Sequence, residues 1–210
     1  MHLFALTLGI WLLPKGDTLT CWECTQGISQ NCTQRECPSQ NHQCGASRVI
    51  TYIGGSKLLD NNKLGCVLPE DCGEGSINFG LSKIWAKTQC CNYKLCNNQW
   101  VPDPIKTITN GRQCFGSLGL TCSNVLACEG NEDHCITTTV DVGGTTTTVQ
   151  GCASKLMCSA SNIVPSQLLG TNSSCCKGNL CNSPVTATAV TASAGLQLVV
   201  VALVSLTLFS

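Results

Sequence analysis

The abundance of cysteine is the feature that most constrains how this chain folds. There are 19 Cys among 210 residues, and so many thiols persist as disulfides only in an oxidising compartment. Charged side chains make up 11% of the chain, and 12 basic residues balance 12 acidic ones. Binding to nucleic-acid phosphates needs a clustered cationic surface, so that class of function is excluded. The polar, Gly-rich and Cys-rich middle of the chain also argues against one large cytosolic α/β enzyme.

The cysteines are spaced in the same way in both halves of the chain. Positions 37 and 44 match 128 and 135, which are seven residues apart, and positions 66 and 72 match 152 and 158, which are six apart. Each half closes with Cys-Cys-x4-Cys-Asn, ending at Asn97 and Asn182. The spacing indicates an internal duplication, with one domain over 21–97 and a second over 112–182.

The segment 98–111 between these domains is predicted to be a linker. It contains Pro102 and Pro104, which favour extended backbone and oppose a helix.

Each half contains a predicted β-hairpin. In the second half, residues 135–142 and 145–152 flank Gly143–Gly144, and β-branched side chains alternate with a period of two. In the first half, residues 48–53 precede Gly54–Gly55. A period-two pattern around a glycine turn is typical of antiparallel strands. We expect an all-β, small disulfide-rich fold, in which disulfides supply the stability that such small cores lack.

The N-terminal residues 1–20 resemble a secretory signal peptide. An apolar run of about 11 residues is too short to span a bilayer but fits the central region of such a signal. Small residues at Gly16, Thr18 and Thr20 predict cleavage within 16–20.

The C-terminal part of the chain has the pattern of a glycosylphosphatidylinositol (GPI) attachment signal. A stretch of small residues, 183–195, precedes an apolar tail, 196–210, and no Lys or Arg follows it. This order of small residues, uncharged spacer and terminal apolar tail is typical of GPI signals. Ala187 is the predicted attachment residue, with Ser183 and Asn182 as alternatives, and a transmembrane helix is the competing interpretation of the tail.

The motifs together resemble the lymphocyte-antigen/urokinase-receptor family, which is related to the snake three-finger toxins. Cys21-x2-Cys24 opens the first half, and Cys-Cys-x4-Cys-Asn closes both halves. The arrangement is similar to urokinase-receptor-like proteins and gamma-type phospholipase A2 inhibitors. The resemblance implies two tandem three-finger domains, each with three hairpin loops projecting from a disulfide-knotted palm. It also implies that Asn97 and Asn182 hold the base of the fingers through hydrogen bonds to backbone.

Sequence alone cannot assign disulfide connectivity, but the family resemblance implies one. The implied pairs are Cys21–Cys44, Cys24–Cys32, Cys37–Cys66, Cys72–Cys90, Cys91–Cys96, Cys114–Cys135, Cys128–Cys152, Cys158–Cys175 and Cys176–Cys181.

The second half departs from the family pattern because it has nine Cys. In the favoured register Cys122 is unpaired, and Ser117 stands where the family has a cysteine. In a competing register Cys114 pairs with Cys122 and leaves Cys135 unpaired. An odd thiol in a secreted chain is either buried and inert or joins two chains, so a disulfide-linked dimer through Cys122 is a hypothesis.

Catalytic and metal chemistry find little support in the sequence. Cys21-Trp-Glu-Cys24 lacks the βαβ context of a redox motif, and oxidised cysteines near His42 or His134 cannot bind zinc. Neither the base nor the nucleophile of a hydrolase is evident, and we expect Asp133–His134 to form structural hydrogen bonds. We therefore predict no enzyme activity, no cofactor and no metal.

Two sequons mark potential N-glycosylation sites, at Asn31 and Asn172. Asn172 is the better candidate, because Cys32 lies inside the first sequon and its early pairing would hinder modification.

Loops at hairpin ends are the expected recognition elements. In the first domain they include the region from Tyr52 to Lys57 and the third loop around Ile84–Trp85. An exposed Trp85 would be a good anchor for a partner, although it could equally pack on the neighbouring hairpin.

The leading expectation is a non-catalytic, GPI-anchored cell-surface protein that binds an extracellular protein ligand or a neighbouring receptor. It would use its finger loops and the cleft between its domains. One alternative is a secreted inhibitor that sequesters a phospholipase A2. A second is a toxin-like modulator of nicotinic receptors, although the finger tips lack the expected cationic charge.

Overall fold

The computed structural model describes residues 18–26, 32–118, 124–142, 144–159 and 170–183. Residues 1–17 of the predicted signal peptide, the GPI tail, Asn31, Cys122 and Ala187 lie outside these residues, whereas residues 18–20 are described and Thr20 already belongs to the first strand. Within them, no helix is both long enough and apolar enough to cross a membrane.

The fold is all-β, as the hairpin pattern predicts. The first half contains β1 (Thr20–Thr25), β2 (Thr33–Glu36), β3 (Gln43–Ile53), β4 (Ser56–Val67), the 3-10 helix η1 (Pro69–Asp71), β5 (Gly73–Asn78) and β6 (Ser82–Cys91). The second contains β7 (Thr109–Leu118), β8 (Asn124–Glu129), β9 (His134–Val142), β10 (Thr145–Ala153), the short helix α2 (Lys155–Cys158) and β11 (Thr171–Cys176). Strand β7 begins at Thr109, so the last part of the predicted linker is already strand.

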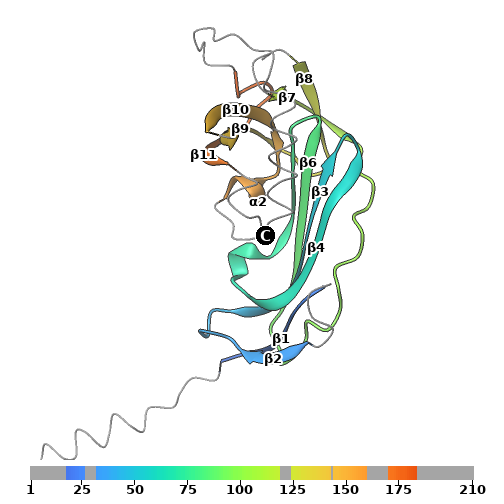
Figure 1. Ribbon diagram of the computed structural model, residues 1–210, viewed down its shortest axis with the longest axis vertical. Helices are drawn as coiled ribbons and strands as arrows, with labels where there is room; N and C mark the ends of the chain where they lie inside the picture. Colours follow the sequence, from blue (N-terminus) through green and yellow to red (C-terminus); the bar gives the residue numbers. More distant parts are fainter. Residues whose placement is uncertain (1–17, 27–31, 119–123, 143, 160–169, 184–210) are drawn as a thin grey trace, which may run out of the picture.

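The two halves share one sheet. Its strand order is β11-β9-β10-β5-β6-β3-β4-β1-β2, with β7 and β8 branching from β10. The long strands β3, β4 and β6 run along the long axis of the molecule, with β1 and β2 at one end and β7 and β8 at the other (Figure 1). The connection between halves is antiparallel pairing of β5 with β10, where Cys152 faces Asn78 and Ala153 faces Ile77.

Nine disulfides hold the palms of the two domains. They join the same nine pairs that the family resemblance implies. Because Cys114 pairs with Cys135, the competing register with a Cys114–Cys122 bond is wrong. In each palm two disulfides lie in contact, with Cys21 Sγ 3.3 Å from Cys37 Sγ and Cys114 Sγ 3.4 Å from Cys128 Sγ. The clusters of cysteine sulfurs in both palms are therefore oxidised and offer no thiolate to a metal.

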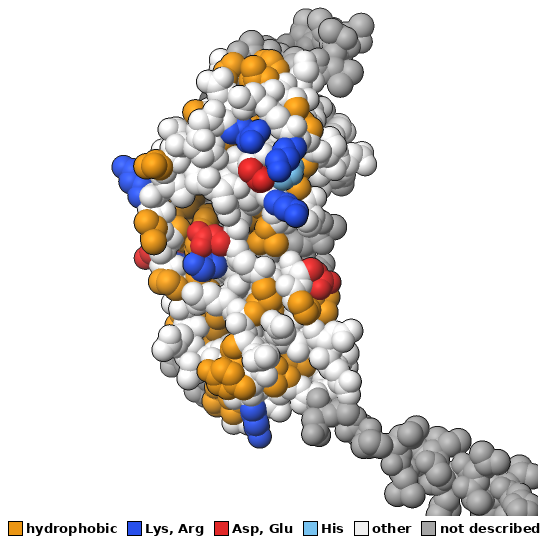
Figure 2. All heavy atoms as spheres, turned by 180° about the vertical axis from the view of Figure 1, so that it is seen from behind, with side chains coloured by type: hydrophobic (Ala, Val, Ile, Leu, Met, Phe, Trp, Pro, Cys, Tyr) orange, Lys and Arg blue, Asp and Glu red, His pale blue; other side chains and the backbone are white. Residues whose placement is uncertain are grey.

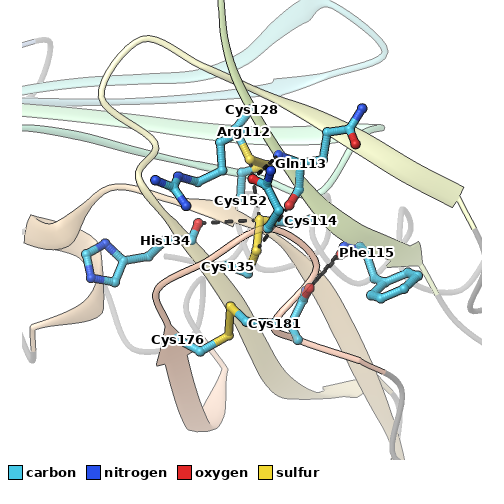
Figure 3. The surroundings of a disulfide bond; sticks show 12 residues. Arg112, Gln113, Cys114, Phe115, Cys128, His134, Cys135, Cys152, Cys176 and Cys181 are labelled. Carbon is cyan, nitrogen blue, oxygen red and sulfur yellow. Dashed lines mark hydrogen bonds between the residues drawn. A yellow bond between two sulfur atoms is a disulfide. The ribbon is translucent and has the colours of Figure 1, made fainter.

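One asparagine locks each palm to the roots of its fingers. Asn97 accepts a hydrogen bond from the Trp22 N–H at 3.0 Å and donates to the carbonyls of Trp22 and Gly45. Asn182 makes the equivalent contacts, accepting from the Phe115 N–H at 2.9 Å and donating to the Phe115 and Ile136 carbonyls. Figure 3 shows the second palm, with Phe115 bonded beside the Cys114–Cys135 and Cys176–Cys181 bridges. Both side chains are buried, and each satisfies backbone groups of strands far apart in sequence.

The largest apolar cluster lies between the domains. Its buried members come from both halves: Val49, Ile77, Phe79, Ile84 and Ala86 from the first, and Ile136, Val149, Ala153 and Met157 from the second. The opposite face of the first domain's sheet has its own cluster, made of Cys24, Ala46, Ile50, Leu64, Trp85 and the linker residue Val101. The central sheet of the first domain is thus covered on one face by the second domain and on the other by the linker.

Two glycines allow the two domains to approach each other closely. A Cβ at Gly151 would lie 2.1 Å from the Asn78 carbonyl oxygen, and a Cβ at Gly75 would lie 2.4 Å from the Ser154 hydroxyl. Such contacts are too short for any side chain. Gly151 therefore marks a close approach to the backbone of the other domain, as glycine inside a strand often does, whereas Gly75 packs against side chains of the second domain.

We predict that Gly151→Ala destabilises the protein because its methyl group collides with backbone across the domain interface. Overpacking of this kind costs roughly 2 kcal/mol. The measurement is the free energy of unfolding of the non-reduced protein in denaturant, followed by tryptophan fluorescence. The control is Gly65→Ala, since a Cβ there meets only the end of the Lys63 side chain at 4.0 Å. Equal stability of the two variants would show that the interface tolerates a side chain.

Candidate binding surface

Polar contacts fix the second domain against the edge of the first. The Ser76 N–H donates to the Ser154 hydroxyl at 3.1 Å, and the Ser154 N–H returns a bond to the Ser76 carbonyl at 2.9 Å. The side-chain amide of Asn131 donates to the Glu74 carbonyl at 2.8 Å. These bonds extend the β5–β10 pairing, so the domains meet through a packed and hydrogen-bonded interface at the place where a cleft was expected.

Glu132 is a buried carboxylate at this interface. It is 0% exposed, and it accepts hydrogen bonds from the Ser76 hydroxyl at 2.7 Å and the Glu129 N–H at 2.8 Å. Lys83 of β6 lies 2.7 Å from Glu129 and 3.8 Å from Glu132. Burial raises the pKa of the Glu132 carboxyl, although these hydrogen bonds and the charge of Lys83 act in the opposite direction. A buried charge needs such partners, and here they come from both domains.

The linker is held on the long β3–β4 finger by an ion-pair network. The Arg48 guanidinium binds the Asp60 carboxylate in a bidentate way. Its Nε donates to Oδ1 at 2.7 Å and its Nη2 donates to Oδ2 at 2.6 Å. It also donates to the Val101 carbonyl at 3.0 Å and to Asp103 at 2.9 Å. Lys57, near the finger tip, binds the same two carboxylates. Arg48 is largely buried, so its bonds to Asp60 are better shielded from water than those of an exposed pair, whereas Asp103 is exposed.

The network lowers the pKa of Asp60. Hydrogen bonding from Arg48 is the main cause, burial opposes it, and the contact with Lys57 adds to it, giving a value of about 2 against an ordinary 3.8. The bonds from Arg48 to Val101 and Asp103 fix the path of the linker towards the second domain. Val101 is buried in the cluster that also contains Trp85.

Large apolar side chains are exposed around the finger tips and the outer side of this linker. Ile105 is 89% exposed and Ile108 is 82% exposed, while Leu58 and Leu81 are about two-fifths exposed. The Gly54 N–H donates to the Leu81 carbonyl at 2.9 Å, so the β3–β4 and β5–β6 turns lie side by side. We call these four residues the tip surface. Figure 2 shows hydrophobic side chains gathered along the left edge of the molecule, which is the side that the linker follows in Figure 1.

The structure corrects one of the two predicted ligand contacts in this region. Trp85 is only 5% exposed, and its indole N–H donates to Glu74 at 3.0 Å. Of the two alternatives that the sequence left open for Trp85, packing is the one that the structure shows, so Trp85 is not available as a ligand contact; it lies within β6 in the cluster that includes Val101 of the linker. Tyr52 is half-buried against the same cluster and lies beside Lys57 and Lys83 in the register of the sheet. It therefore borders the tip surface.

The remaining predicted positions are distributed over the second domain. Asn172 is exposed and has a left-handed backbone with φ 55°, and its glycosylation stays a prediction. Ser183 is exposed, whereas Asn182 is buried in the palm. The expected structural bond within Asp133–His134 is present, with Nδ1 and Oδ1 2.7 Å apart.

The Arg48–Asp60–Asp103 network and the buried Glu132 were missed from the sequence. The residues of each group come from separate elements, so their spacing in the sequence carries no signal. For the interface between the domains, the one signal in the sequence was the presence of Gly75 and Gly151 inside strands, which indicates close packing.

A family model for the u-PAR/Ly-6 domain matches this chain twice, over residues 17–99 and 111–184. The chain belongs to the u-PAR/Ly-6 family. The urokinase plasminogen activator surface receptor of Mus musculus is 31% identical over 189 residues, which cover 81% of this chain and 57% of the receptor. The chain thus spans about half the length of that receptor.

Phospholipase A2 inhibitors of snakes are also similar to this chain. The inhibitor CNF of Crotalus durissus terrificus is 27% identical over 145 residues, covering 64% of this chain and 71% of the inhibitor. Among solved structures, mouse TEX101 aligns over 75% of this chain and 97% of its own, at 14% identity and a TM-score of 0.28, a score too low for comparing the two arrangements. These relatives are named as a receptor and an inhibitor, so the u-PAR/Ly-6 proteins that match this chain are binding proteins.

We predict that the Asp60 network makes the protein sensitive to acid. Because the pKa of folded Asp60 lies below its ordinary value, the network stabilises the fold above about pH 4, and this contribution is lost as the pH falls towards 2. The free energy of unfolding should therefore fall more steeply over this range in the wild type than in Asp60→Asn. Glu70→Gln is the control, because Glu70 is exposed and forms no ion pair among the described residues. Parallel pH profiles for the wild type and Asp60→Asn would contradict the prediction.

Proposed function

We propose that this protein is a GPI-anchored cell-surface binding protein or co-receptor whose extracellular protein ligand contacts the tip surface. The observation that carries the proposal is the exposure of Ile105 and Ile108 on a segment that is anchored on both sides. Asp103 is held by Arg48 and Lys57, and Thr107 donates to Glu129 at 2.8 Å. The Ile108 carbonyl accepts from the Gly130 N–H at 2.9 Å.

Anchoring matters because an ordered surface loses little conformational entropy when it binds. Single exposed apolar residues are ordinary on protein surfaces. Here two exposed isoleucines occur within four residues of a fixed segment, in which Asp103 contacts Lys57, next to Leu58, and Thr107 contacts Lys83, two residues after Leu81. Large apolar side chains on a rigid support are suitable anchors for a protein partner.

The membrane anchor and covalent modifications are parts of the same proposal. The small residues followed by an apolar tail support GPI attachment. Attachment at Ala187 would leave a few residues between the anchor and Asn182, which is buried in the palm. We also infer glycosylation at Asn172, where the side chain is exposed, with Asn31 as a second site, and a disulfide-linked dimer through Cys122.

A secreted inhibitor of phospholipase A2 is the second candidate function. It is supported by the similarity to inhibitors that carry this name and that match over most of their length. In that case the protein would bind a phospholipase A2 and suppress its catalysis. Modulation of nicotinic receptors stays a weaker prediction, which a receptor current assay would test.

We predict that the double variant Ile105→Asp/Ile108→Asp loses ligand binding without unfolding. Two charges in the apolar centre of an interface should weaken binding by at least about ten-fold. The full chain would be screened against purified extracellular proteins, including urokinase plasminogen activator and a secreted phospholipase A2, and the affinities of both forms compared. Tyr93→Asp is the matched control, since Tyr93 is 66% exposed but lies between Cys91 and Cys96 at the palm. Unchanged affinity of the double variant would place the binding surface elsewhere, and suppressed phospholipase activity would favour the inhibitor.

We predict that phosphatidylinositol-specific phospholipase C releases the protein from cells that express the full chain. Release follows from a lipid anchor, because this enzyme cleaves the anchor lipid and leaves transmembrane helices intact. The measurement is the amount of protein on the cell surface and in the medium before and after treatment. A transmembrane protein expressed in the same cells serves as the control. Protein found only in the medium, with no surface pool, would contradict the anchor and favour the secreted inhibitor.

A further inference from the structure

A polar pocket lies at the palm of the second domain. Its volume is about 530 Å³, and it is lined by Asn110, Gly111, Arg112, Asp133 and Asn179. These residues come from the start of β7, the approach to β9 and the loop between Cys176 and Cys181. The volume is within the range of small-ligand sites, but none of the described residues that line it has an apolar or aromatic side chain. Its occupant must therefore be recognised by hydrogen bonds and charge.

The walls of the pocket are fixed by hydrogen bonds to backbone. The Asn110 amide donates to the Gly130 and Glu132 carbonyls, both at 3.0 Å, and its oxygen accepts from the Arg112 N–H at 2.9 Å. The Asn179 oxygen accepts from the Gln113 N–H at 3.2 Å. These bonds hold the polar groups of three separate segments in place.

The groups left for a ligand are mainly donors. Within the described part of the chain, neither the Arg112 guanidinium nor the Asn179 amide nitrogen has a hydrogen-bond acceptor. The one carboxylate in the lining, Asp133, is bonded to His134 at 2.7 Å. Figure 3 shows Arg112 and His134 extending to the same side of the palm disulfides. Such a pocket favours a ligand rich in acceptor oxygens.

Charge points to the same conclusion. Five cations of the first domain are paired with carboxylates: Arg35, Arg48, Lys57, Lys83 and Lys87. The cations of the second domain, Arg112, Lys155 and Lys177, form no ion pair with any described carboxylate. Figure 2 shows Lys and Arg side chains grouped around an acidic side chain and a histidine on the upper part of one face. Arg112 lines the pocket, and Lys177 lies in the same Cys176–Cys181 loop as Asn179, so two cations without an ion pair among the described residues belong to this palm.

Lys177 lies in the Cys176–Cys181 loop, which also supplies Asn179 to the pocket. Burial acts to raise the pKa of Asp133, but the hydrogen bond from His134 and the charges of His134 and Lys177 outweigh it, so its pKa is lowered. Asp133 is therefore the one negative charge within the pocket, and it opposes an anionic ligand.

We propose that this pocket binds an oxyanion group of an acidic saccharide, with Arg112 as the principal contact and Lys177 and Asn179 as supporting donors. The planar guanidinium matches the two oxygens of a sulfate or a carboxylate. A protein partner is less favoured, because no apolar anchor residue lines the pocket. The shared ligand chemistry has two extracellular sources, sulfate groups of glycosaminoglycans and carboxylates of sialylated glycans.

The test uses the full chain, expressed in mammalian cells and captured on beads. Binding of labelled heparan sulfate oligosaccharide, sialylated oligosaccharide and an acidic peptide is measured for the wild type and single-site variants. Arg112→Gln should weaken saccharide binding about ten-fold, and Lys177→Gln should weaken it several-fold. Asp133→Asn should strengthen it several-fold, which a folding defect cannot imitate.

Lys94→Gln is the matched control. Lys94 is exposed in the corresponding loop of the first domain, between Cys91 and Cys96, and its removal changes the net charge equally. Binding of either saccharide with this pattern supports the proposal and identifies the source of the anion. Equal losses for Lys94→Gln and Arg112→Gln would overturn it in favour of diffuse charge. Binding of neither saccharide, or of the acidic peptide alone, would also overturn it.

Discussion

The disulfide palm is the constraint on which the rest of this structure depends. In each palm two bridges lie in contact, and a buried asparagine ties their surroundings to the first strand of the domain. Because the roots of the fingers are fixed covalently, the fingers need no separate core at each root. Their apolar side chains are then available for packing further out along the strands. That is where the two domains join.

Fixed roots explain why the long finger of the first domain can be buried on both faces. Val49 and Ile84 face the second domain, while Ile50 and Trp85 face the linker. Successive residues of a strand point to opposite sides of the sheet, so a strand covered on both sides buries consecutive side chains. The covering elements are held by different means, the second domain by close packing at Gly75 and Gly151, and the linker by the Arg48 network.

The proposed tip surface and the proposed pocket both follow from this arrangement. The first lies where the linker passes the turns of the long finger, and the second lies on the opposite domain's palm. A u-PAR/Ly-6 protein built in this way presents two chemically different surfaces on one framework, one apolar and one rich in donors. The tip surface is suited to a protein partner, because removing its apolar side chains from water favours binding. The pocket is suited to a small acidic group, because its donors can form directed hydrogen bonds to the oxygens of that group.

The sequence by itself determined the parts of this protein that depend on local pattern. Cysteine spacing and the terminal Cys-Asn identified the duplication, and through the family resemblance the disulfide pairs. The alternation around Gly143–Gly144 located a hairpin, which the structure forms from β9 and β10. Only the tertiary structure decided which faces meet. Trp85 shows why, since a period-two strand does not reveal whether its second face meets water or another element. The linker covers that face here, and Arg48, Asp60 and Asp103, distant in sequence, are brought together by the same contact.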